Sequence, residues 1–464
     1  MCTLGPASAT PKMVQGLVRA GASLFRLNFS HGTPDEHDRM VQLVRGAEAA
    51  SGLPLAVLAD LPGPKVRLGN VDPDPFPFRP GQRFELRPGG RGDARGAATT
   101  YPGLARDLQP RDRVLLADGA VELVVTGFRG DVVMCECVRG GLIRSGQGVN
   151  LPAERLGLPA VTERDHECLA RALGMRVDIV AQSFVRAPED VRELRSIMGD
   201  RAVPIVAKIE TRPAVRAIEG ILDEADAVMI ARGDLGVELP LEEIPLIQKD
   251  LVRRAREAGR PAIVATQMLE SMIHAPRPTR AEATDVANAV LDGADAVMLS
   301  GETAVGEYTF EAASTATTIA AHVEAAGTPF RAWQHPRAPS SEGAAVAHAA
   351  ASIPFAHLAI VAITCYTETG RTARLLSCER PDVPIYAFVP PDDVRRTMSL
   401  LWGVRALPAD VPPDTDGMIA LMDEGLRQHG LAEGGDAVVM AAASPAGRTT
   451  TNMLKIHHVG SPVR

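Results

Sequence analysis

The stretch AIVATQMLES, residues 262–271, is an apolar run followed directly by polar residues, and three other runs have the same form. They are IVAKIE (205–210), AVMIARGD (227–234) and AVMLSGE (296–302). A buried parallel strand is typically such a continuous apolar run, and in a barrel of parallel strands the catalytic residues follow the strands. Side chains two residues apart on a strand share a face, so Lys208 and Glu210 point the same way. The sequence therefore predicts a barrel whose active site places a cation beside a metal-binding carboxylate.

Apolar runs of this style recur along the first two thirds of the chain, most of them followed by helical patterns. Seven can be counted: SLFRLNF (23–29), PLAVLAD (54–60), DIVAQSF (178–184), PIVAKIE (204–210), DAVMIAR (226–232), AIVATQ (262–267) and DAVMLSGE (295–302). Alternating strands and helices indicate a parallel sheet, and an eighth strand would close a TIM (β/α)8 barrel. The candidate eighth strand is CTLGPAS, where only CTL precedes Gly5 and Pro6. We expect this first strand to be short and the natural protein to carry further N-terminal residues.

Two segments interrupt or follow the barrel pattern. Residues 65–151 are rich in Gly, Pro and Arg and contain alternating runs around turn signals, which predicts an inserted small antiparallel β-barrel, a lid. Residues 333–464 contain five apolar runs separated by helical patterns, which predicts a doubly wound α/β domain. The predicted barrel domain is then discontinuous and comprises residues 1–64 and 152–332.

Composition excludes several classes of protein. The chain has 464 residues, 45% of them hydrophobic, and no apolar run approaches the ~20 residues that a membrane span needs. A net charge of −8 argues against nucleic-acid binding. The six cysteines are scattered and form no zinc pattern, which favours reduced thiols and a cytoplasmic location.

Eight motifs along the chain resemble those of the pyruvate kinase family. They are TLGPAS, FRLNFSHG, AKIE, ARGDLGVE, ATQMLESM, PRPTRAE, DVANAVLDGADAVMLSGETA and TETGRTARLLS. The resemblance implies a barrel with a mobile lid inserted after its third strand, a C-terminal regulatory domain and a homotetramer. It also implies transfer of the phosphoryl group of phosphoenolpyruvate to ADP, followed by protonation of the enolate to pyruvate.

The resemblance assigns roles to charged residues at the predicted strand ends. Glu210 and Asp234 resemble the ligands of Mg²⁺, for which Mn²⁺ can substitute, and carboxylates suit this hard ion. Lys208 resembles the lysine that stabilises the phosphoryl group during transfer. Arg26 and Arg67 resemble phosphate-binding arginines. The alternative to these functional roles is that the residues are salt-bridged or solvated charges without a catalytic function.

Uncharged groups of the predicted site also match the family pattern. The backbone of Arg232, Gly233 and Asp234 resembles a turn that binds the substrate carboxylate at a helix start. Thr266 and Ser300 resemble residues tied to enolate binding and proton delivery, with helix capping as the alternative role.

The nucleotide contacts that the resemblance implies are Thr3, His31, Arg67 and the GVN run at Gly148. The lid departs from the family pattern here, because Gln147 stands where a lysine usually precedes GVN. Arg144 is a candidate replacement for that lysine.

A monovalent-cation site of the family is altered in this sequence. Asn28, Ser30, Asp60 and Leu61 match positions of the potassium site. Potassium-dependent members carry Thr, Lys, Glu and Thr where this chain has Leu61, Pro62, Lys65 and Leu68. An ammonium in place of a glutamate substitutes for the ion and can pair with Asp60. We therefore predict a pyruvate kinase that requires Mg²⁺ but not K⁺. The alternative interpretation is that Lys65 is an exposed lysine without a role at the site.

The TETGRT run of the C-terminal domain resembles a loop that binds an effector phosphate. Small and hydroxyl residues and an arginine open a helix there: Thr367, Thr369, Gly370, Arg371 and Thr372. The resemblance implies a phosphorylated allosteric effector, while a well-capped helix is the alternative.

Two other functional classes stay open at this point. One is a different Mg²⁺-dependent barrel enzyme acting on enolates, such as an aldolase or lyase, against which the lid and C-terminal domain argue. The other is a non-catalytic regulatory paralogue, against which Lys208, Glu210, Asp234 and Thr266 argue.

Overall fold

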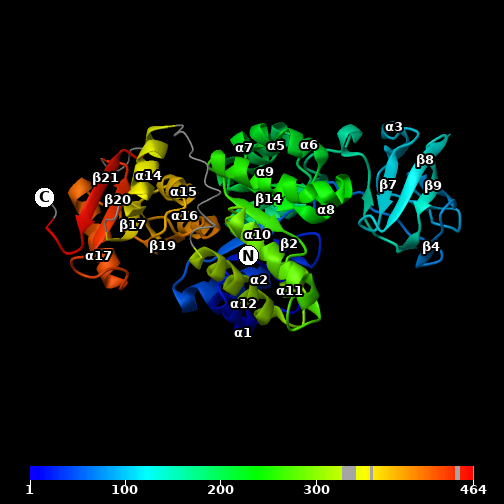
Figure 1. Cartoon of the computed structure of the whole chain (residues 1–464). Helices are drawn as coiled ribbons and strands as arrows, with labels where there is room; N and C mark the ends of the chain where they lie inside the picture. The colour runs from blue at the N-terminus through cyan, green and yellow to red at the C-terminus, as the bar shows by residue number, and fades with distance from the viewer. Residues whose placement is uncertain (327–340, 356–358, 445–449, 463–464) are drawn as a thin grey trace.

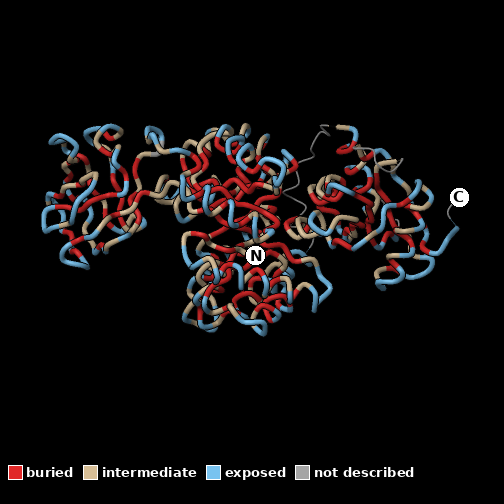
Figure 2. Tube along the Cα trace, turned by 180° about the vertical axis from the view of Figure 1, so that it is seen from behind, coloured by how far each residue is buried: buried red, intermediate tan, exposed pale blue. Residues whose placement is uncertain are grey.

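A computed structural model describes residues 1–326, 341–355, 359–444 and 450–462. The described residues form three bodies in a row: a central barrel, a lid on one side and an α/β domain on the other (Figure 1). Buried residues concentrate in the middle of each body, with exposed residues around them (Figure 2). Among the described residues, no helix combines the length and the hydropathy needed to cross a bilayer.

The central body is a barrel of parallel strands, as predicted. Within the described residues eight strands form one sheet, and an isolated bridge between Cys2 and Leu299 joins its two edges. In sheet order the strands are β1 (Cys2–Thr3), β2 (Leu24–Asn28), β3 (Ala56–Asp60), β12 (Ile179–Gln182), β13 (Ile205–Ile209), β14 (Ala227–Ala231), β15 (Ala262–Ala265) and β16 (Ala296–Met298). Each of the eight predicted runs supplies one strand. The first has only two residues, in line with the expected short strand.

Helices surround the strands and are delimited by recognisable signals. They are α1 (Pro11–Arg19), α2 (Pro34–Ser51), α4 (Glu163–Gly174), α5 (Pro188–Met198), α6 (Arg212–Arg216), α7 (Ile218–Glu224), α8 (Arg232–Glu238), α9 (Ile244–Glu257), α10 (Arg280–Leu291), α11 (Gly301–Ala304) and α12 (Thr309–Ala325). Thr33 and Glu36 form a capping box at the start of α2, which ends at Gly52 in a left-handed conformation. Such caps satisfy backbone groups that a helix end leaves unpaired.

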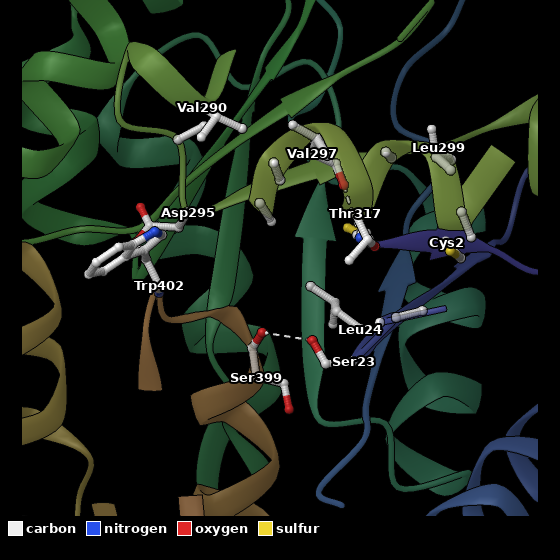
Figure 3. A pocket seen from close by; sticks show the side chains of 18 of the residues that line it. Cys2, Ser23, Leu24, Val290, Asp295, Val297, Leu299, Thr317, Ser399 and Trp402 are labelled. Carbon is white, nitrogen blue, oxygen red and sulfur yellow. Dashed lines mark hydrogen bonds between the residues drawn. The ribbon is translucent and has the colours of Figure 1, made fainter. Parts of the chain in front are cut away.

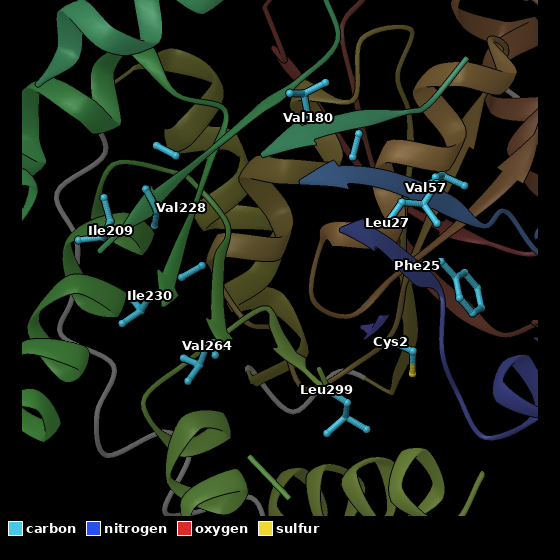
Figure 4. Close-up of a cluster of buried hydrophobic side chains, with 14 of the residues drawn as sticks. Cys2, Phe25, Leu27, Val57, Val180, Ile209, Val228, Ile230, Val264 and Leu299 are labelled. Atoms are coloured by element: carbon cyan, nitrogen blue, oxygen red, sulfur yellow. The ribbon is translucent and has the colours of Figure 1, made fainter. Parts of the chain in front are cut away.

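The strands are buried on both faces, which explains their continuous apolar character. Side chains such as Phe25, Val57 and Val264 point outward into the layer between sheet and helices (Figure 4). Alternate side chains, among them Leu58 and Met229, fill the barrel interior. The filled interior leaves the ends of the strands as the place for a site.

The lid lies between β3 and β12 in sequence, as predicted. Its elements are β4 (Phe76–Phe78), β5 (Arg83–Arg87), β6 (Gly96–Ala98), α3 (Leu104–Asp107), β7 (Arg113–Leu116), β8 (Val121–Arg129), β9 (Val132–Arg139), β10 (Gly141–Ile143) and β11 (Val149–Asn150). The described strands form a six-stranded sheet and a two-stranded ribbon around one apolar core. Pairing is antiparallel except between β5 and β6, which run parallel because a loop carries the chain back between them.

The C-terminal body is an α/β domain with helices on both sides of a sheet. Its elements are α14 (Glu342–Ser352), β17 (Ile360–Tyr366), α15 (Arg371–Cys378), β18 (Ile385–Val389), α16 (Asp392–Thr397), β19 (Val404–Pro408), α17 (Thr415–Gln428), β20 (Ala437–Ala442) and β21 (Met453–His458). The described strands have the order β19-β18-β17-β20-β21, and only β21 is antiparallel to its neighbour. The two faces of this sheet carry separate cores, as expected of a doubly wound sheet.

The C-terminal domain docks against the amino ends of the barrel strands, opposite the predicted site. Arg380 is almost fully buried there, donates to the Gly293 carbonyl at 2.7 Å, pairs with Asp295 at 3.0 Å and lies over the Trp402 ring. Beside this contact lies a cavity of about 210 Å³, lined among others by Leu24, Ser399 and Trp402, and the Ser23 hydroxyl donates to the Ser399 carbonyl at 3.4 Å at its edge (Figure 3). This cavity is therefore remote from the polar carboxyl ends of the strands.

Candidate active site

A buried cluster of charges lies at the carboxyl ends of β2, β3 and β13. Asp60 accepts from Arg26 Nε at 2.6 Å through one oxygen, and its other oxygen lies 3.2 Å from Lys208 Nζ. Lys208 Nζ also lies 3.0 Å from Glu210 Oε1. The Asp60 and Glu210 carboxylates are 1% and 2% exposed, so these ion pairs are largely shielded from water. Neighbouring strands thus bring together residues that are far apart in sequence.

The pKa values of these groups reflect burial and mutual pairing. Burial opposes ionisation of Asp60, but Lys208 and Arg26 outweigh it and lower the pKa of that carboxyl. Burial likewise opposes the charge on Lys208, but Asp60 and Glu210 raise the pKa of the ammonium. The pKa of Glu210 is raised, first by burial and also by Asp234, against the opposing effect of Lys208. A cation at Glu210 would relieve this unfavourable burial.

Glu210 and Asp234 fit the role of magnesium ligands. They are hard oxygen donors, and Asp234 is close enough for its charge to raise the pKa of Glu210. Glu210 is held in place by the Phe184 amide, which donates to Oε2 at 2.8 Å. The described residues contain no group of three His, Cys, Asp or Glu side chains suited to a metal. Further ligands would therefore come from substrate and water, as Mg²⁺ commonly requires.

Lys65 does not pair with Asp60 as expected. Its Nζ lies 3.0 Å from Asp234 Oδ1 and 3.8 Å from Asp118 Oδ1 of the lid. The physical reason is that Arg26 and Lys208 already occupy the Asp60 carboxylate. The Lys65 ammonium is nevertheless at the site, beside a candidate magnesium ligand.

A strained turn follows β15 and faces the start of α8. Thr266 and Gln267 have φ values of 71° and 55°, a left-handed conformation that costs a β-branched residue on the order of 1–3 kcal/mol. The Thr266 hydroxyl donates to the Ala265 carbonyl at 2.6 Å and accepts from the Gly233 amide at 2.9 Å. The hydroxyl is thereby fixed beside the 232–234 turn, and the strain marks a functional position.

The side chain of Arg232 turns into the protein. It donates to the Thr266 carbonyl at 2.6 Å and forms two 2.7 Å bonds with Asp285 of α10. Only the backbone of this residue is left for the predicted contact with the substrate carboxylate.

Ser300 lies at the end of the β16 segment. Its amide donates to Glu302 Oε2 at 2.7 Å, and Glu302 Oε1 accepts from the Leu269 amide at 3.0 Å. The buried Glu302 carboxylate therefore joins the loop that carries Thr266 to the loop that carries Ser300.

The predicted nucleotide residues lie at two places. Thr3 is buried, and its hydroxyl accepts from Arg26 Nη1 at 3.2 Å, while His31 is exposed on the loop after β2. Arg67 lies in the lid, where Nη1 donates to the Gly146 carbonyl at 3.1 Å. Arg144 is exposed, and its amide is capped by the Gln147 side chain at 2.7 Å.

The predicted cation-site residues lie around the buried charge cluster. The Asn28 side chain accepts from the Ser30 amide at 3.1 Å. The Leu61 carbonyl accepts from the Ser183 hydroxyl at 2.7 Å. Their surroundings therefore include the ammonium of Lys208, which binds Ser183 Oγ at 2.8 Å.

The predicted effector loop precedes α15. Gly370 has a φ of 77° and caps the helix, Thr369 is exposed, and Thr367 is buried. The Thr372 hydroxyl lies 2.8 Å from that of Thr451, so this hydroxyl already has a partner within the domain.

Several residues of the site were missed at the sequence level. Ser183 follows an apolar run just as Lys208 lies near the end of one, so the same signal could have identified it. Glu302 ends the AVMLSGE run and could have been identified in the same way, whereas Asp118 and Asp285 gave no such signal, because their roles depend on contacts between distant segments.

Glu238, at the end of α8, provides a pH-dependent prediction. Burial raises the pKa of its carboxyl from 4.5 to about 7, with Asp234 and Glu154 adding to the increase and Arg212 opposing it. The folded state therefore binds a proton more tightly than the unfolded state. Stability from this group is fully present below about pH 4.5 and is lost as the pH rises through about 7.

We expect Glu238→Gln to be more stable than the parent at about pH 8, by up to about 3 kcal/mol, with a smaller advantage at about pH 5. Thermal unfolding midpoints of both proteins at the two pH values measure this. Glu219→Gln, which alters an exposed carboxyl paired with Arg254, is the control and should show no such pH-dependent gain. A gain of equal size at both pH values for Glu238→Gln would contradict the assignment.

Comparison with known proteins identifies relatives along the whole chain. The family model described as pyruvate kinase, barrel domain, matches residues 1–313, and the model described as pyruvate kinase, alpha/beta domain, matches residues 344–457. Pyruvate kinases of Mycobacterium intracellulare and Mycobacterium tuberculosis (strain CDC 1551 / Oshkosh) are each 43% identical over 464 residues, covering 99% of this chain and 98% of the relative. A pyruvate kinase of Clostridium acetobutylicum is 38% identical over 465 residues, covering 98% of both chains.

Proposed function

Because this chain belongs to the pyruvate kinase family, we propose that it transfers the phosphoryl group of phosphoenolpyruvate to ADP, giving pyruvate and ATP, as the last step of glycolysis. The observation that carries the proposal is the buried cluster in which Lys208 lies between Asp60 and Glu210, with Arg26 alongside. Phosphoryl transfer needs positioning and charge stabilisation more than covalent chemistry. This cluster supplies fixed cations in a site that is shielded from water.

Each charged residue then has a specific task. Lys208 stabilises the phosphoryl group during transfer, and Arg26 orients its oxygens, as does Arg67 once the lid approaches the barrel. Glu210 and Asp234 would hold Mg²⁺, or Mn²⁺ in its place, which when bound neutralises and orients the substrate carboxylate and phosphate. Backbone amides of the turn at Arg232, Gly233 and Asp234 bind the substrate carboxylate at the start of α8.

Protonation of the enolate requires hydroxyl groups on the opposite side of the site. Thr266 contributes the hydroxyl that is fixed against the Gly233 amide, and Ser300 contributes a second one. Thr3 and His31 bind ADP, together with Arg67 of the lid. Arg144 remains the candidate for the missing lid lysine.

We also propose that the enzyme does not require potassium. In support, the Lys65 ammonium lies 3.0 Å from Asp234. Potassium-dependent members of the family carry a glutamate at the position of Lys65, and the charge of that glutamate needs a cation nearby. The former ion ligands are then Asn28, Ser30, Asp60 and Leu61, and a free K⁺ among them would meet the positive charges of Lys65, Lys208 and Arg26.

A phosphorylated effector is proposed for the loop of Thr367, Thr369, Gly370, Arg371 and Thr372. The glycine-capped start of α15, with Arg371 at its first position, supports anion binding there. We further propose a cytoplasmic homotetramer, since regulation requires two states with different effector affinity.

Replacing Arg371 with Ala is expected to abolish activation by the effector, because the loop loses its only described cation. Substrate saturation curves with and without phosphorylated sugars and nucleotides give the activation ratio, which is the activity with effector divided by the activity without it. This ratio should fall to about one in the Arg371→Ala variant, because an effector that binds both conformational states equally does not shift the equilibrium between them. Arg374→Ala, one turn further along α15, is the matched control. If no phosphorylated metabolite alters the curve of the parent enzyme, the effector proposal fails.

The proposed domain boundaries are 1–64 with 152–332 for the barrel, 65–151 for the lid and 333–464 for the regulatory domain. The separate apolar cores of the three bodies support them. The boundary between 332 and 333 lies outside the described residues.

A coupled assay for pyruvate formation tests the proposed function. Turnover that depends on phosphoenolpyruvate, ADP and Mg²⁺ is the expected result. Cleavage or condensation of an enolate without ADP would point to an aldolase or lyase, and absence of turnover would point to a non-catalytic paralogue.

A further inference from the structure

The guanidinium of Arg232 contacts several elements that meet below the site. Arg232 begins α8 directly after β14, and its side chain is 15% exposed. Nε donates to the Ala265 carbonyl at 3.2 Å, and Nη2 donates to the Thr266 carbonyl at 2.6 Å. Nη1 donates to Gln248 of α9 at 3.2 Å. One side chain therefore ties the end of β15 to the start of α8.

Asp285 fixes the orientation of this guanidinium. Both of its oxygens accept from Arg232 at 2.7 Å, in the two-pronged geometry that orients the guanidinium plane most strongly. Asp285 lies on α10, which packs outside the barrel. The pair thus anchors the turn to a helix of the outer layer.

The backbone held by Arg232 is strained. Thr266 and Gln267 are consecutive residues with positive φ, which neither side chain favours. Strained conformations persist only where surrounding contacts over-determine them. The two carbonyls bound by Arg232 flank the Thr266 position itself, so these bonds oppose relaxation of the turn.

We propose that the Arg232–Asp285 ion pair is a positioning device that holds the Thr266 hydroxyl at the reacting carbon for protonation of the enolate. This inference rests on the proposed function, because it assigns the protonation half of that reaction to Thr266. Neither Arg232 nor Asp285 needs to contact the substrate through its side chain. Loss of the pair allows the turn to relax and moves the hydroxyl away from Gly233, while the cluster around Lys208 is unchanged.

The test variant is Asp285→Asn, which keeps the shape of the side chain and removes its charge. Two rates are measured: net turnover of phosphoenolpyruvate, and exchange of the methyl hydrogens of pyruvate with D₂O in the presence of ATP and Mg²⁺, followed by NMR. Exchange should fall about tenfold or more, and the solvent isotope effect on kcat should rise, because protonation becomes slow. The KM for phosphoenolpyruvate should stay within about threefold.

Asp226→Asn is the matched control. Asp226 pairs with Arg195 at 2.8 Å at the opposite end of β14 and is about as exposed as Asp285. This variant should leave the exchange rate near that of the parent. Similar losses in both variants would show a general effect on the fold and overturn the proposal.

A double substitution tests whether the pair acts through Thr266. In a Thr266→Ala background, Asp285→Asn should reduce exchange by less than about threefold, since the hydroxyl to be positioned is gone. If Asp285→Asn reduces exchange by the same factor in the Thr266→Ala background as in the parent enzyme, the proposal is overturned. Arg232→Lys, which keeps the charge but loses the two-pronged geometry, should reproduce the exchange defect if Asp285→Asn fails to fold. Absence of turnover in the parent enzyme would instead refute the proposed function.

Discussion

A Lys208→Met variant is expected to lose phosphoryl transfer, with kcat reduced on the order of a hundredfold or more. A cation directed at the transferring group acts mainly in the transition state, so its loss appears in kcat more than in substrate affinity. The buried position of Lys208, between Asp60 and Glu210, adds to the effect because no water can replace the lost charge efficiently.

The same substitution leaves two buried carboxylates with fewer partners. Asp60 keeps Arg26, and Glu210 keeps the Phe184 amide. Breaking a buried pair costs about 3–5 kcal/mol, so the thermal unfolding midpoint must be measured together with kcat. Lys12→Met, at an exposed position on α1, is the control. Near-normal kcat in a folded Lys208→Met protein would rule out the assigned role.

The second large effect concerns potassium. In tetramethylammonium buffer the parent enzyme should be active, and added K⁺ should change kcat by less than about twofold, whereas Lys65→Glu should show a rise of tenfold or more, about 1.4 kcal/mol. The physical reason is that glutamate adds a further negative charge beside Asp234, which lies close to Glu210, and a monovalent cation is needed to balance it.

Lys65→Met separates the two parts of this prediction. It removes the ammonium without adding a carboxylate, so kcat should fall with much less recovery on addition of K⁺ than in Lys65→Glu. Sodium replaces potassium in a parallel titration to show whether any rise is specific to the ion. A tenfold activation of the parent enzyme by K⁺ would falsify the proposal of potassium independence.

The fold could be predicted largely from the sequence, because its signals are local. Each barrel strand is an apolar run that must be buried on both faces. The lid is recognisable in the sequence as a long interruption of the strand–helix pattern after PLAVLAD. Polar residues at the ends of these runs, such as Lys208, Glu210 and Thr266, could therefore be assigned to one edge of the sheet. The first strand was expected to be short, and β1 has two residues.

Pairing between side chains was less predictable. Lys65 was expected to pair with Asp60 because its ammonium was predicted to substitute for the potassium ion, yet it pairs with Asp234, 169 residues away. The outcome depended on competition, since Arg26 and Lys208 reach Asp60 from adjacent strands and leave it no free oxygen for a further cation.

The sequence by itself determined the order of strands and helices, the position of the lid, the family and the chemistry of most residues at the strand ends. Only the tertiary structure decided that Arg232 turns inward to Asp285, that Ser183 and Glu302 brace the site, and that Arg380 is buried against the barrel. Apolar periodicity is a property of a few neighbouring residues, and burial enforces it wherever they lie. An ion pair depends instead on distances between separate elements, which exist only once the barrel has closed and its helices have packed.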